Sequence, residues 1–396
     1  MSNIILFDQP EIRDSLLPFT FTRPVACIRV GIITIAEKWE KFLDKDLSFL
    51  TQEYLTKKYP VKFSDDNLFI NGAVCPNNEL VKEIQALPIG AGLYKNDVLI
   101  ASRNSSEDPL LVDDSARMEF AGDITIIDEV VKIFKYNALQ IAADFDLLTQ
   151  GRKSAEINDP HTIVYGIENV FIEEGAVIRA AIINAESGPV YIGKNAQIHE
   201  GSMIKGSFAL CEGSHVNMGA KIKGDTTIGP FSKVGGEISN SVIFGYSNKG
   251  HDGFLGNSVL GEWCNLGADT NTSNLKNNYA DVKIWNYGKG GFKDTGEMFC
   301  GLMMGDHSKC GINTMFNTGT VVGVSANIFG SGFPRNFVPS FSWGGANGFT
   351  TFQLRKVFEV AEIVMSRRGV ELDDIEKEIL QNIFEQSVPN RVWENK

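Results

Sequence analysis

The sequence lacks any uninterrupted run of about 18 apolar residues, the length that a transmembrane helix requires. Its N-terminus, MSNIILFDQPEIRD, also lacks the basic segment and the long apolar core of a signal peptide. Positive charge is scarce as well, since 37 Lys and Arg against 49 Asp and Glu give a net charge of −12. We therefore expect a cytoplasmic protein with no membrane or nucleic-acid partner, in which a few local cations bind any phosphorylated ligand.

Closely spaced cysteines are absent too. The six cysteines include no C-x-x-C pair, which argues against a structural zinc site and favours reduced, buried thiols. The hydrophobic fraction of 43% and the charged fraction of 22% are those of an ordinary globular protein. The 396 residues suggest two or three domains.

Glycine is abundant, and its uneven spacing accompanies a repeat of six residues. Aliphatic residues occupy every sixth position in one long run: Ile192, Ile198, Ile204, Leu210, Val216, Ile222, Ile228 and Val234. The register then slips, and it resumes at Leu260, Leu266 and from Met304 to Ile328, while an earlier copy lies at Ile172–Val177. A period of six fits neither an amphipathic helix nor an ordinary strand. It predicts a parallel β-helix, in which each hexapeptide forms one short strand and one corner.

This repeat divides the chain into three predicted domains. Residues 160–344 form the β-helix, with a glycine- and asparagine-rich loop at 272–302 that leaves the coils. Residues 1–155 carry mixed strand and helix signals and predict an α/β domain, and residues 350–396 predict two C-terminal helices. A solenoid this short exposes flat faces, and burying one of them favours a trimer.

The segment around His251 carries the strongest functional signal. It contains Gly250-His251, Leu255-Gly256-Asn257, Gly261, Asn265, Gly267-Ala268 and Thr270. This spacing resembles the acetyltransferase domain of the bifunctional enzyme that makes UDP-N-acetylglucosamine, a left-handed parallel β-helix that forms trimers. The resemblance implies His251 as the general base and Glu237 as its supporting carboxylate. It also implies that Asn265 and Asn274 line a cleft for the amino sugar and acetyl-CoA.

Some positions depart from that family. Its tyrosine is Phe254 here, and a lysine after the glutamate is Ser239. Three cations, Lys233, Lys249 and Lys276, are our candidates for the missing sugar-phosphate contacts.

The chemistry explains the residue types. A histidine suits a base that must work near neutral pH. Backbone N–H groups near Gly267 and Ala268 are candidates to stabilise the oxyanion, and no metal is needed. In the family the last coils bind coenzyme A, which implies coenzyme-binding roles for Gly330 and Arg335 here, and the resemblance implies the same role for Ala268.

The N-terminal domain resembles a trimmed sugar-phosphate nucleotidyltransferase. The segment LLPFTFTRPVACIRV keeps that family's spacing at Leu17-Pro18, Thr20 and Arg23-Pro24. Its glycine-rich phosphate loop is missing, and Arg13 stands at the loop's arginine. Asn71-Gly72 matches the family's metal motif, but Ala73 replaces the carboxylate, so Mg²⁺ binding would need another acid such as Asp8 or Asp128.

Nearly the whole chain resembles a divergent form of the bifunctional UDP-N-acetylglucosamine diphosphorylase and glucosamine-1-phosphate N-acetyltransferase, a form also labelled as a glucose-1-phosphate thymidylyltransferase. The first hypothesis is an acetyl-CoA-dependent N-acetyltransferase acting on glucosamine-1-phosphate. The second is a nucleotidyltransferase that makes a UDP- or dTDP-sugar, with the β-helix as a trimerising arm. The third is a non-catalytic, trimeric sugar-nucleotide-binding protein.

Overall fold

The computed structural model describes residues 3–394, and its chain divides into two compact units. The first unit comprises the residues up to Leu16, Thr22–Ile28 and Ile33–Glu129. The second comprises Leu17–Phe21, Arg29–Ile32 and the chain from Val130 onward. No helix in the described range is long and apolar enough to cross a membrane.

The first unit is an α/β fold around a six-stranded mixed sheet. The sheet order is β2 (Ser48–Leu50), β1 (Asn3–Phe7), β3 (Asn67–Asn71), β6 (Val98–Asn104), β5 (Gly92–Lys95) and β7 (Arg117–Glu119). Strand β1 pairs in parallel with both β2 and β3, whereas β6 is antiparallel to its neighbours. The remaining elements are α1 (Pro10–Ser15), α2 (Ile35–Leu43), α3 (Asn78–Ala86) and the antiparallel pair β4 (Val74–Cys75) and β8 (Thr125–Ile126).

Local sequence explains where the helices of this unit begin. The side chain of Thr34 accepts a hydrogen bond from the Glu37 N–H, and the Glu37 carboxylate accepts one from the Thr34 N–H, which is a capping box. The side chain of Asn77 caps α3 in the same way by accepting from the Leu80 N–H.

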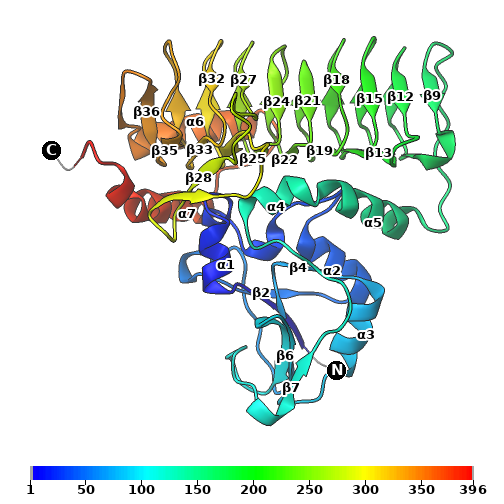
Figure 1. The fold of residues 1–396 in the computed structure, drawn as a ribbon, viewed down its shortest axis with the longest axis vertical. Helices are drawn as coiled ribbons and strands as arrows, with labels where there is room; N and C mark the ends of the chain where they lie inside the picture. Colours follow the sequence, from blue (N-terminus) through cyan, green and yellow to red (C-terminus); the bar gives the residue numbers. More distant parts are fainter. Residues whose placement is uncertain (1–2, 395–396) are drawn as a thin grey trace. The chain divides into compact units, whose positions relative to one another are not determined.

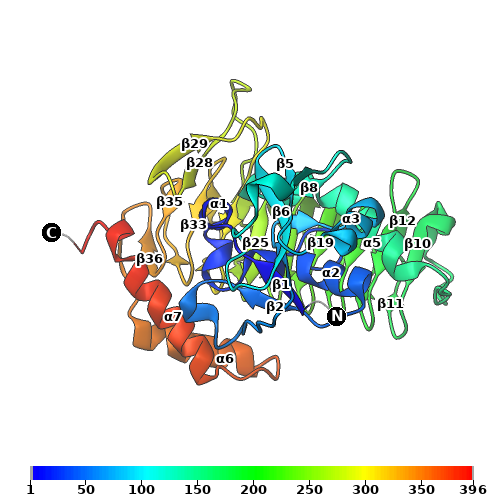
Figure 2. The ribbon, with the colours of Figure 1, turned by 90° about the horizontal axis from the view of Figure 1, so that it is seen from below.

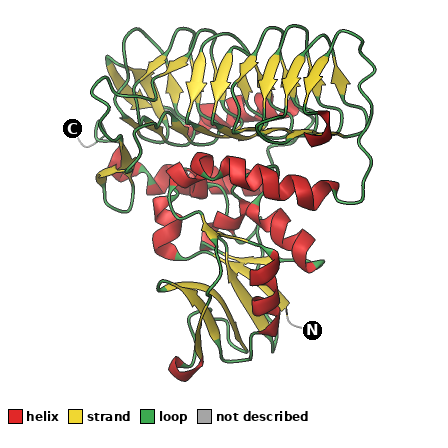
Figure 3. Ribbon diagram, turned by 45° about the vertical axis from the view of Figure 1, so that its right-hand side comes forward, coloured by secondary structure: helices red, strands yellow, loops and turns green. Residues whose placement is uncertain are grey.

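The second unit is a parallel β-helix with three faces (Figure 1, Figure 3). Its first face comprises β10 (Val170–Ile172), β13 (Val190–Ile192), β16 (Phe208–Leu210), β19 (Thr226–Ile228), β22 (Val242–Gly245), β25 (Val259–Glu262), β30 (Met303–Met304), β33 (Val321–Val322) and β35 (Phe337–Val338). Its second face comprises β11 (Val177–Ile178), β14 (Gln197–Ile198), β17 (His215–Val216), β20 (Lys233–Val234), β23 (Asn248–Lys249), β26 (Asn265–Leu266), β31 (Lys309–Cys310), β34 (Asn327–Ile328) and β36 (Ser342–Gly345), with β37 (Gly348–Thr351) antiparallel at the end.

The third face is formed by β9 (Ile163–Tyr165), β12 (Ile182–Asn184), β15 (Met203–Lys205), β18 (Lys221–Ile222), β21 (Glu237–Ser239) and β24 (Phe254–Gly256). The separate pair β27 (Asn271–Thr272) and β32 (Met315–Phe316) follows along the chain. The side chains of Asn271 and Thr272 in β27 accept hydrogen bonds from the Phe254 and Gly256 N–H groups of β24. This arrangement confirms the predicted fold class, an α/β domain followed by a parallel β-helix with C-terminal helices.

The predicted six-residue column fills the interior of this β-helix. All eight residues from Ile192 to Val234 are at most 3% exposed. Burying each such side chain contributes about 1.5–3 kcal/mol to folding, so the column is a main source of stability. The earlier copy keeps this register, since Ile172 and Ile178 point inward and pair with Ile192 and Ile198, whereas Val177 is in an outward position and is 40% exposed. The register slip after Val234 reflects shorter coils.

The predicted loop at 272–302 is a hairpin that leaves the β-helix. Thr272 still belongs to β27 and pairs with Phe316. The chain then forms β28 (Lys283–Asn286) and β29 (Gly291–Asp294), which pair antiparallel and project from the coils in Figure 2. It rejoins the first face where the Leu302 carbonyl accepts a hydrogen bond from the Val259 N–H.

Two helices and two short N-terminal segments cover the first face. Helices α4 (Val130–Lys135) and α5 (Asn137–Thr149) belong to the second unit, although the sequence predicted a first domain of residues 1–155. The Thr227 hydroxyl donates to the Gly31 carbonyl at 2.8 Å, and the rings of Phe19 and Phe244 are 5.2 Å apart. This cover is needed because outward residues of this face, such as Phe244, are apolar.

The C-terminal helices are α6 (Leu354–Ser366) and α7 (Asp374–Gln386), as expected. Gly369, with a φ of 70°, ends the first of them, and the Val370 N–H donates to the Met365 carbonyl. The ring of Phe384 lies 5.0 Å from that of Phe341 at the edge of the last coil.

The close stacking of the coils yields a stability prediction at Gly229. A Cβ atom added there would lie 1.9 Å from the Phe244 carbonyl oxygen of the next coil. Gly229→Ala should therefore lower the free energy of unfolding by about 1–3 kcal/mol or more, as overpacking does. Gly291→Ala is the matched control, because a Cβ at Gly291 would meet no atom within 4 Å. Equal melting temperatures for the two variants in thermal unfolding would contradict this account.

Candidate functional site

His251 lies at the corner that joins the second face to the third. Residues 250–253 connect β23 to β24, and the His251 side chain is exposed. The backbone of this corner is tightly held. The Asn217 side-chain amide donates to the Gly250 carbonyl at 2.7 Å, and a Cβ on Gly235 would lie 2.5 Å from the same oxygen. The imidazole therefore projects from a fixed piece of backbone.

Lys249 lies inside the β-helix rather than on its surface. It occupies an interior position that apolar residues such as Val234 and Leu266 fill in neighbouring coils, and it is 1% exposed. Its ammonium group donates to the His251 carbonyl at 2.6 Å and to the Asp252 carbonyl at 3.0 Å. The predicted role of Lys249 as a sugar-phosphate ligand is therefore not supported by its position, and its visible role is to hold the His251 corner.

Glu237 lies on the third face, in register between Lys221 and Phe254. Its carboxylate forms an ion pair with Lys223 at 2.6 Å, so the nearest described partner of Glu237 is a lysine. Glu237, Lys221, Phe254, Asp252 and Asn271 are among the residues that line a shallow cavity of about 310 Å³. Two cations, two carboxylates and an aromatic ring thus lie beside the His251 corner.

Sequence reasoning missed Lys221 and Lys223. The signal was available, because both lie one coil before Glu237 in the outward positions of the hexapeptide that contains Ile222.

Asn274 lies close to the same part of the third face. Its amide donates to the Asn257 side-chain oxygen at 2.8 Å. A Cβ added to Gly256 would lie 2.5 Å from the Phe254 ring and 2.8 Å from the Asn274 amide nitrogen. Of the predicted residues, Glu237, Phe254 and Asn274 are therefore brought together.

Lys233 and Asn265 lie on the second face, on the other side of the His251 corner. Lys233 pairs in register with Asn248, and Asn248 pairs with Asn265, so the three side chains form one outward column. Both Lys233 and Asn265 are exposed. The predicted substrate residues thus divide between two faces that meet at His251.

The next corner along the axis contains Ala268. The Gly267 N–H already donates to the Cys310 carbonyl at 3.1 Å, so it is not free to bind an oxyanion. The Ala268 N–H has no acceptor among the described residues and is the better candidate. Ala268 itself is half-buried.

The remaining predicted residues of the second unit lie farther along the chain. Lys276 donates to the Asp281 carbonyl at 2.5 Å within the excursion that carries the hairpin. Gly330 is exposed and has a φ of 101°. Arg335 is exposed at a cavity of about 700 Å³ whose other lining residues include Trp285, Phe292, Phe349 and Trp393.

The predicted nucleotide-site residues lie in the first unit. Asn71 ends β3, its amide donates to the Gln9 side chain at 3.0 Å, and the Gly72 N–H donates to the Phe7 carbonyl. Arg13 is buried and donates to the Tyr54 hydroxyl at 2.9 Å. Arg23 is 4% exposed.

Asp8 follows β1 at the same edge of the sheet. One carboxylate oxygen accepts from the Val25 N–H at 2.8 Å, and the other accepts from the Thr51 hydroxyl at 2.6 Å. Burial raises the pKa of Asp8 to about 6, although these hydrogen bonds and Arg13 lower it. A half-buried carboxyl whose two oxygens both accept hydrogen bonds is a poor ligand for Mg²⁺, which binds through one or two carboxylates and keeps several waters. Among residues 3–394, no three His, Cys, Asp or Glu side chains cluster in a way that would hold a metal.

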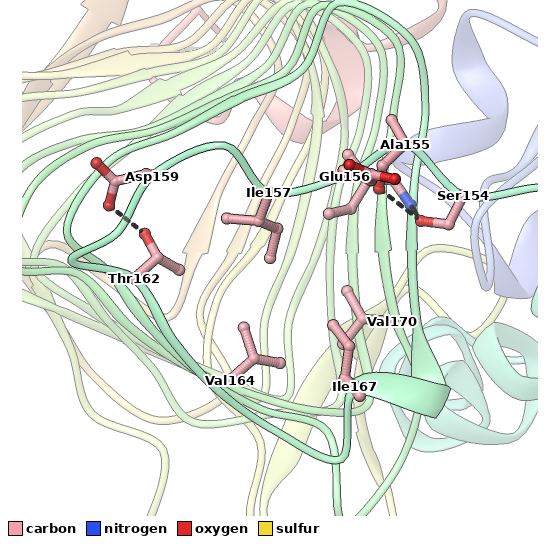
Figure 4. A pocket seen from close by; sticks show the side chains of 10 residues that line it. Ser154, Ala155, Glu156, Ile157, Asp159, Thr162, Val164, Ile167 and Val170 are labelled. Carbon is pink, nitrogen blue, oxygen red and sulfur yellow. Dashed lines mark hydrogen bonds between the residues drawn. The ribbon is translucent and has the colours of Figure 1, made fainter.

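A further cavity, of about 490 Å³, lies at the mouth of the β-helix (Figure 4). Residues 154–159 cross the open first coil, where the Thr162 hydroxyl donates to Asp159 at 2.8 Å and the Ser154 hydroxyl accepts from the Ile172 N–H. Ile157, Val164 and other apolar side chains line it. No histidine or cysteine is among the residues that line this cavity. The segment of residues 154–159 covers the end of the interior column.

One protein family and several known proteins are similar to parts of this chain. Residues 4–153 match the family described as sugar nucleotidyl transferase. Over 247 residues the chain is 25% identical to a bifunctional sugar-1-phosphate nucleotidylyltransferase/acetyltransferase of Sulfurisphaera tokodaii, which covers 61% of this chain and 57% of the relative. Over 158 residues it is 27% identical to the bifunctional protein GlmU of Methanococcus aeolicus, with 39% and 33% coverage. These matches confirm the predicted resemblance.

The chain spans only about half the length of the first of these relatives and a third of the second. Among solved structures, the polySia-specific acetyltransferase NeuO aligns with a TM-score of 0.26 and 14% identity over 49% of this chain and 83% of that one. An Arabidopsis UDP-N-acetylglucosamine acyltransferase aligns with a TM-score of 0.24 and 17% identity over 53% and 78%.

The position of Lys249 predicts a particular pH dependence of stability. Burial lowers the pKa of Lys249 in the folded protein from 10.5 to about 8. Between these pH values the unfolded chain binds a proton that the folded protein does not, so rising pH stabilises the fold. Wild type should therefore gain melting temperature relative to Lys249→Met between pH 8 and 10, with a constant difference below pH 7. Lys194→Met, at an exposed lysine, is the control. Parallel curves for wild type and Lys249→Met would refute the buried position.

Proposed function

We propose that this protein transfers the acetyl group of acetyl-CoA to the amino group of a sugar phosphate, with glucosamine-1-phosphate as the acceptor. The observation that carries this proposal is the position of His251, an exposed imidazole on a rigid corner between two sets of polar side chains. Lys221, Lys223 and Glu237 lie on one side of it, and Lys233 and Asn265 lie on the other. The resemblance to bifunctional acetyltransferases supports the same reaction.

The reaction requires a base because a protonated amine has no lone pair. The free amine attacks the thioester carbon, the amine proton passes to His251 Nε2 or Nδ1, and the tetrahedral intermediate expels the coenzyme A thiolate, which takes up a proton. Histidine titrates near neutral pH and can accept that proton. The Ala268 N–H is the donor we assign to the oxyanion.

The charges beside His251 suit a phosphorylated acceptor. Lys221 and Lys223 provide positive charge on an otherwise acidic protein, and the phosphate group of the acceptor is dianionic near neutral pH. The pairing of Glu237 with Lys223 means that Glu237 also orients a cation. We place the coenzyme's adenine ring in the aromatic cavity at Arg335, since planar bases stack on aromatic rings.

The first prediction on activity concerns His251. His251→Ala should leave folding intact and lower acetyl transfer by roughly 10²–10⁴-fold, the usual contribution of a general base. The assay is thiol release from acetyl-CoA with glucosamine-1-phosphate between pH 6 and 9. Glu237→Gln should lower the rate of acetyl transfer less, because Glu237 orients neighbouring groups such as Lys223 and does not itself remove the proton. A His251→Ala enzyme with the wild-type rate and pH profile would remove His251 from the mechanism.

A homotrimer is part of this proposal. The edge of a triangular prism is convex, so the residues on the two faces beside His251 need a second wall to enclose one ligand. The third face offers an uncovered apolar column, in which Ile163, Ile182 and Met203 lie in register and are 50%, 41% and 48% exposed. Contact between copies through this column would bury it.

The trimer is tested by a charge in that column. Met203→Glu should shift the protein from trimer to monomer in multi-angle light scattering, because an interface rarely tolerates a buried unpaired charge. Ile363→Glu, at a 62% exposed residue of α6, is the control and should leave the mass unchanged. Monomeric wild-type protein at micromolar concentration would refute the trimer.

Nucleotidyl transfer by the first unit is the second candidate function, favoured by the family match of residues 4–153. The engaged carboxylate of Asp8 and the alanine at position 73 argue against an efficient metal site. If neither activity is found, the third hypothesis, a sugar-nucleotide-binding trimer, remains.

We predict weak or absent pyrophosphate release from UTP or dTTP with N-acetylglucosamine-1-phosphate or glucose-1-phosphate in the presence of Mg²⁺. Robust release would contradict the prediction. Its loss in Asp8→Asn but not in Asp97→Asn, an exposed carboxylate with 94% of its side chain accessible, would then identify Asp8 as the metal ligand.

A further inference from the structure

A cluster of basic side chains lies on the second face, away from the cavity beside Glu237. His215 and Lys233 are adjacent in register on β17 and β20. The His199 ring, just after β14, lies 5.8 Å from that of His215. Arg368, just after α6, donates from its guanidinium to the Asn248 side-chain oxygen at 3.1 Å, and Asn248 is the next residue of the column after Lys233. We call His199, His215, Lys233 and Arg368 the second-face basic cluster.

These basic side chains are close enough to influence one another. The pKa of His215 is lowered by burial first and then by the positive charges of Lys233, His199 and Arg368. The pKa of Arg368 is lowered by burial and by Arg367. Within residues 3–394, none of the four cluster residues forms an ion pair. Like charges on neighbouring strands destabilise a sheet, and an anion bound between them would relieve that repulsion.

We propose that the second-face basic cluster is a binding site for a phosphate ester. The chemistry of the donors matches that ligand: the arginine guanidinium offers a planar set of N–H donors, the lysine a mobile point charge, and the two imidazoles further N–H donors. The side chains come from three successive coils and from the end of α6, so the fold brings together donors that are far apart in sequence.

The cluster lies near the proposed reaction. Lys233 lies one coil before β23, the strand that contains Lys249 and leads to the His251 corner. One coil is about 4.8 Å along the axis of the β-helix. Two phosphate esters take part in the proposed function, the sugar phosphate and coenzyme A, and their shared group is what the cluster recognises. Which of them occupies it rests on the proposed function, whereas phosphate binding itself does not.

Calorimetric titration without turnover tests the site. The probes are inorganic phosphate, glucosamine-1-phosphate, coenzyme A and dephospho-coenzyme A, each added to wild type, Lys233→Met and Arg368→Met. We expect each substitution to weaken binding of the occupying ligand roughly 10-fold or more, the usual effect of losing a charge-assisted hydrogen bond. Arg355→Met is the control, because Arg355 lies at the opposite end of α6 and pairs with Glu359 at 2.6 Å.

The pattern of losses identifies the ligand. Weakened binding of coenzyme A but not of dephospho-coenzyme A assigns the 3′-phosphate, and weakened binding of glucosamine-1-phosphate assigns the acceptor. Lys233→Met separates a ligand effect from displacement of α6, since Lys233 is an exposed strand residue. Wild-type affinities in both variants, or no binding of any probe to wild type, would overturn the proposal. If wild type transfers no acetyl group yet the cluster still binds phosphate, the proposed function fails and the site stands.

Discussion

The in-register stacking of aliphatic side chains inside the β-helix is the constraint on which the rest of the second unit depends. Each interior residue packs on its counterpart one coil before and one coil after, while the backbone hydrogen bonds run between the same coils. The coils can therefore neither slide nor spread without exposing the interior column. The corners between strands are held in fixed positions as well, because strands anchor their backbone at both ends. At Gly229 the backbone passes so close to the next coil that no Cβ atom fits.

The corner that carries His251 is held in place by Lys249, a charged residue in the interior of the β-helix. Lys249 replaces an aliphatic residue, and its ammonium hydrogen-bonds the two carbonyls of the corner that carries the histidine. A buried cation is costly, and a depressed pKa reflects that cost. A costly buried charge in the interior thus holds an ordered corner at the surface. The residues that we assign to the acceptor lie on the two faces beside this corner, whereas the cavity that we assign to the coenzyme lies at Arg335.

Much of the fold was predictable because its period is visible in the sequence. The column from Ile192 to Val234 predicted which side chains point inward, and residues 350–396 were predicted to form two helices, as they do in α6 and α7. The candidate site was less predictable. A lysine in a glycine-rich turn is predicted to lie on the surface. Only the register of β23, in which Lys249 pairs with Val234, shows that Lys249 points inward. Lys221 and Lys223 were missed because they come close to Glu237 only when the chain has completed one coil. The number of residues in that coil is not evident from the sequence, because the six-residue register slips after Val234. The cover of the first face by Leu17–Phe21 and Arg29–Ile32 depends on contacts across some 200 residues, which no local pattern encodes.

The most direct test of this account is the release of free thiol from acetyl-CoA by the wild-type protein, measured with and without glucosamine-1-phosphate. The account predicts release that depends on the amino sugar phosphate, with one N-acetylated sugar phosphate formed for each thiol and no requirement for a metal ion. Thiol release that is the same without the sugar phosphate, or none at all from protein that binds coenzyme A, would contradict it.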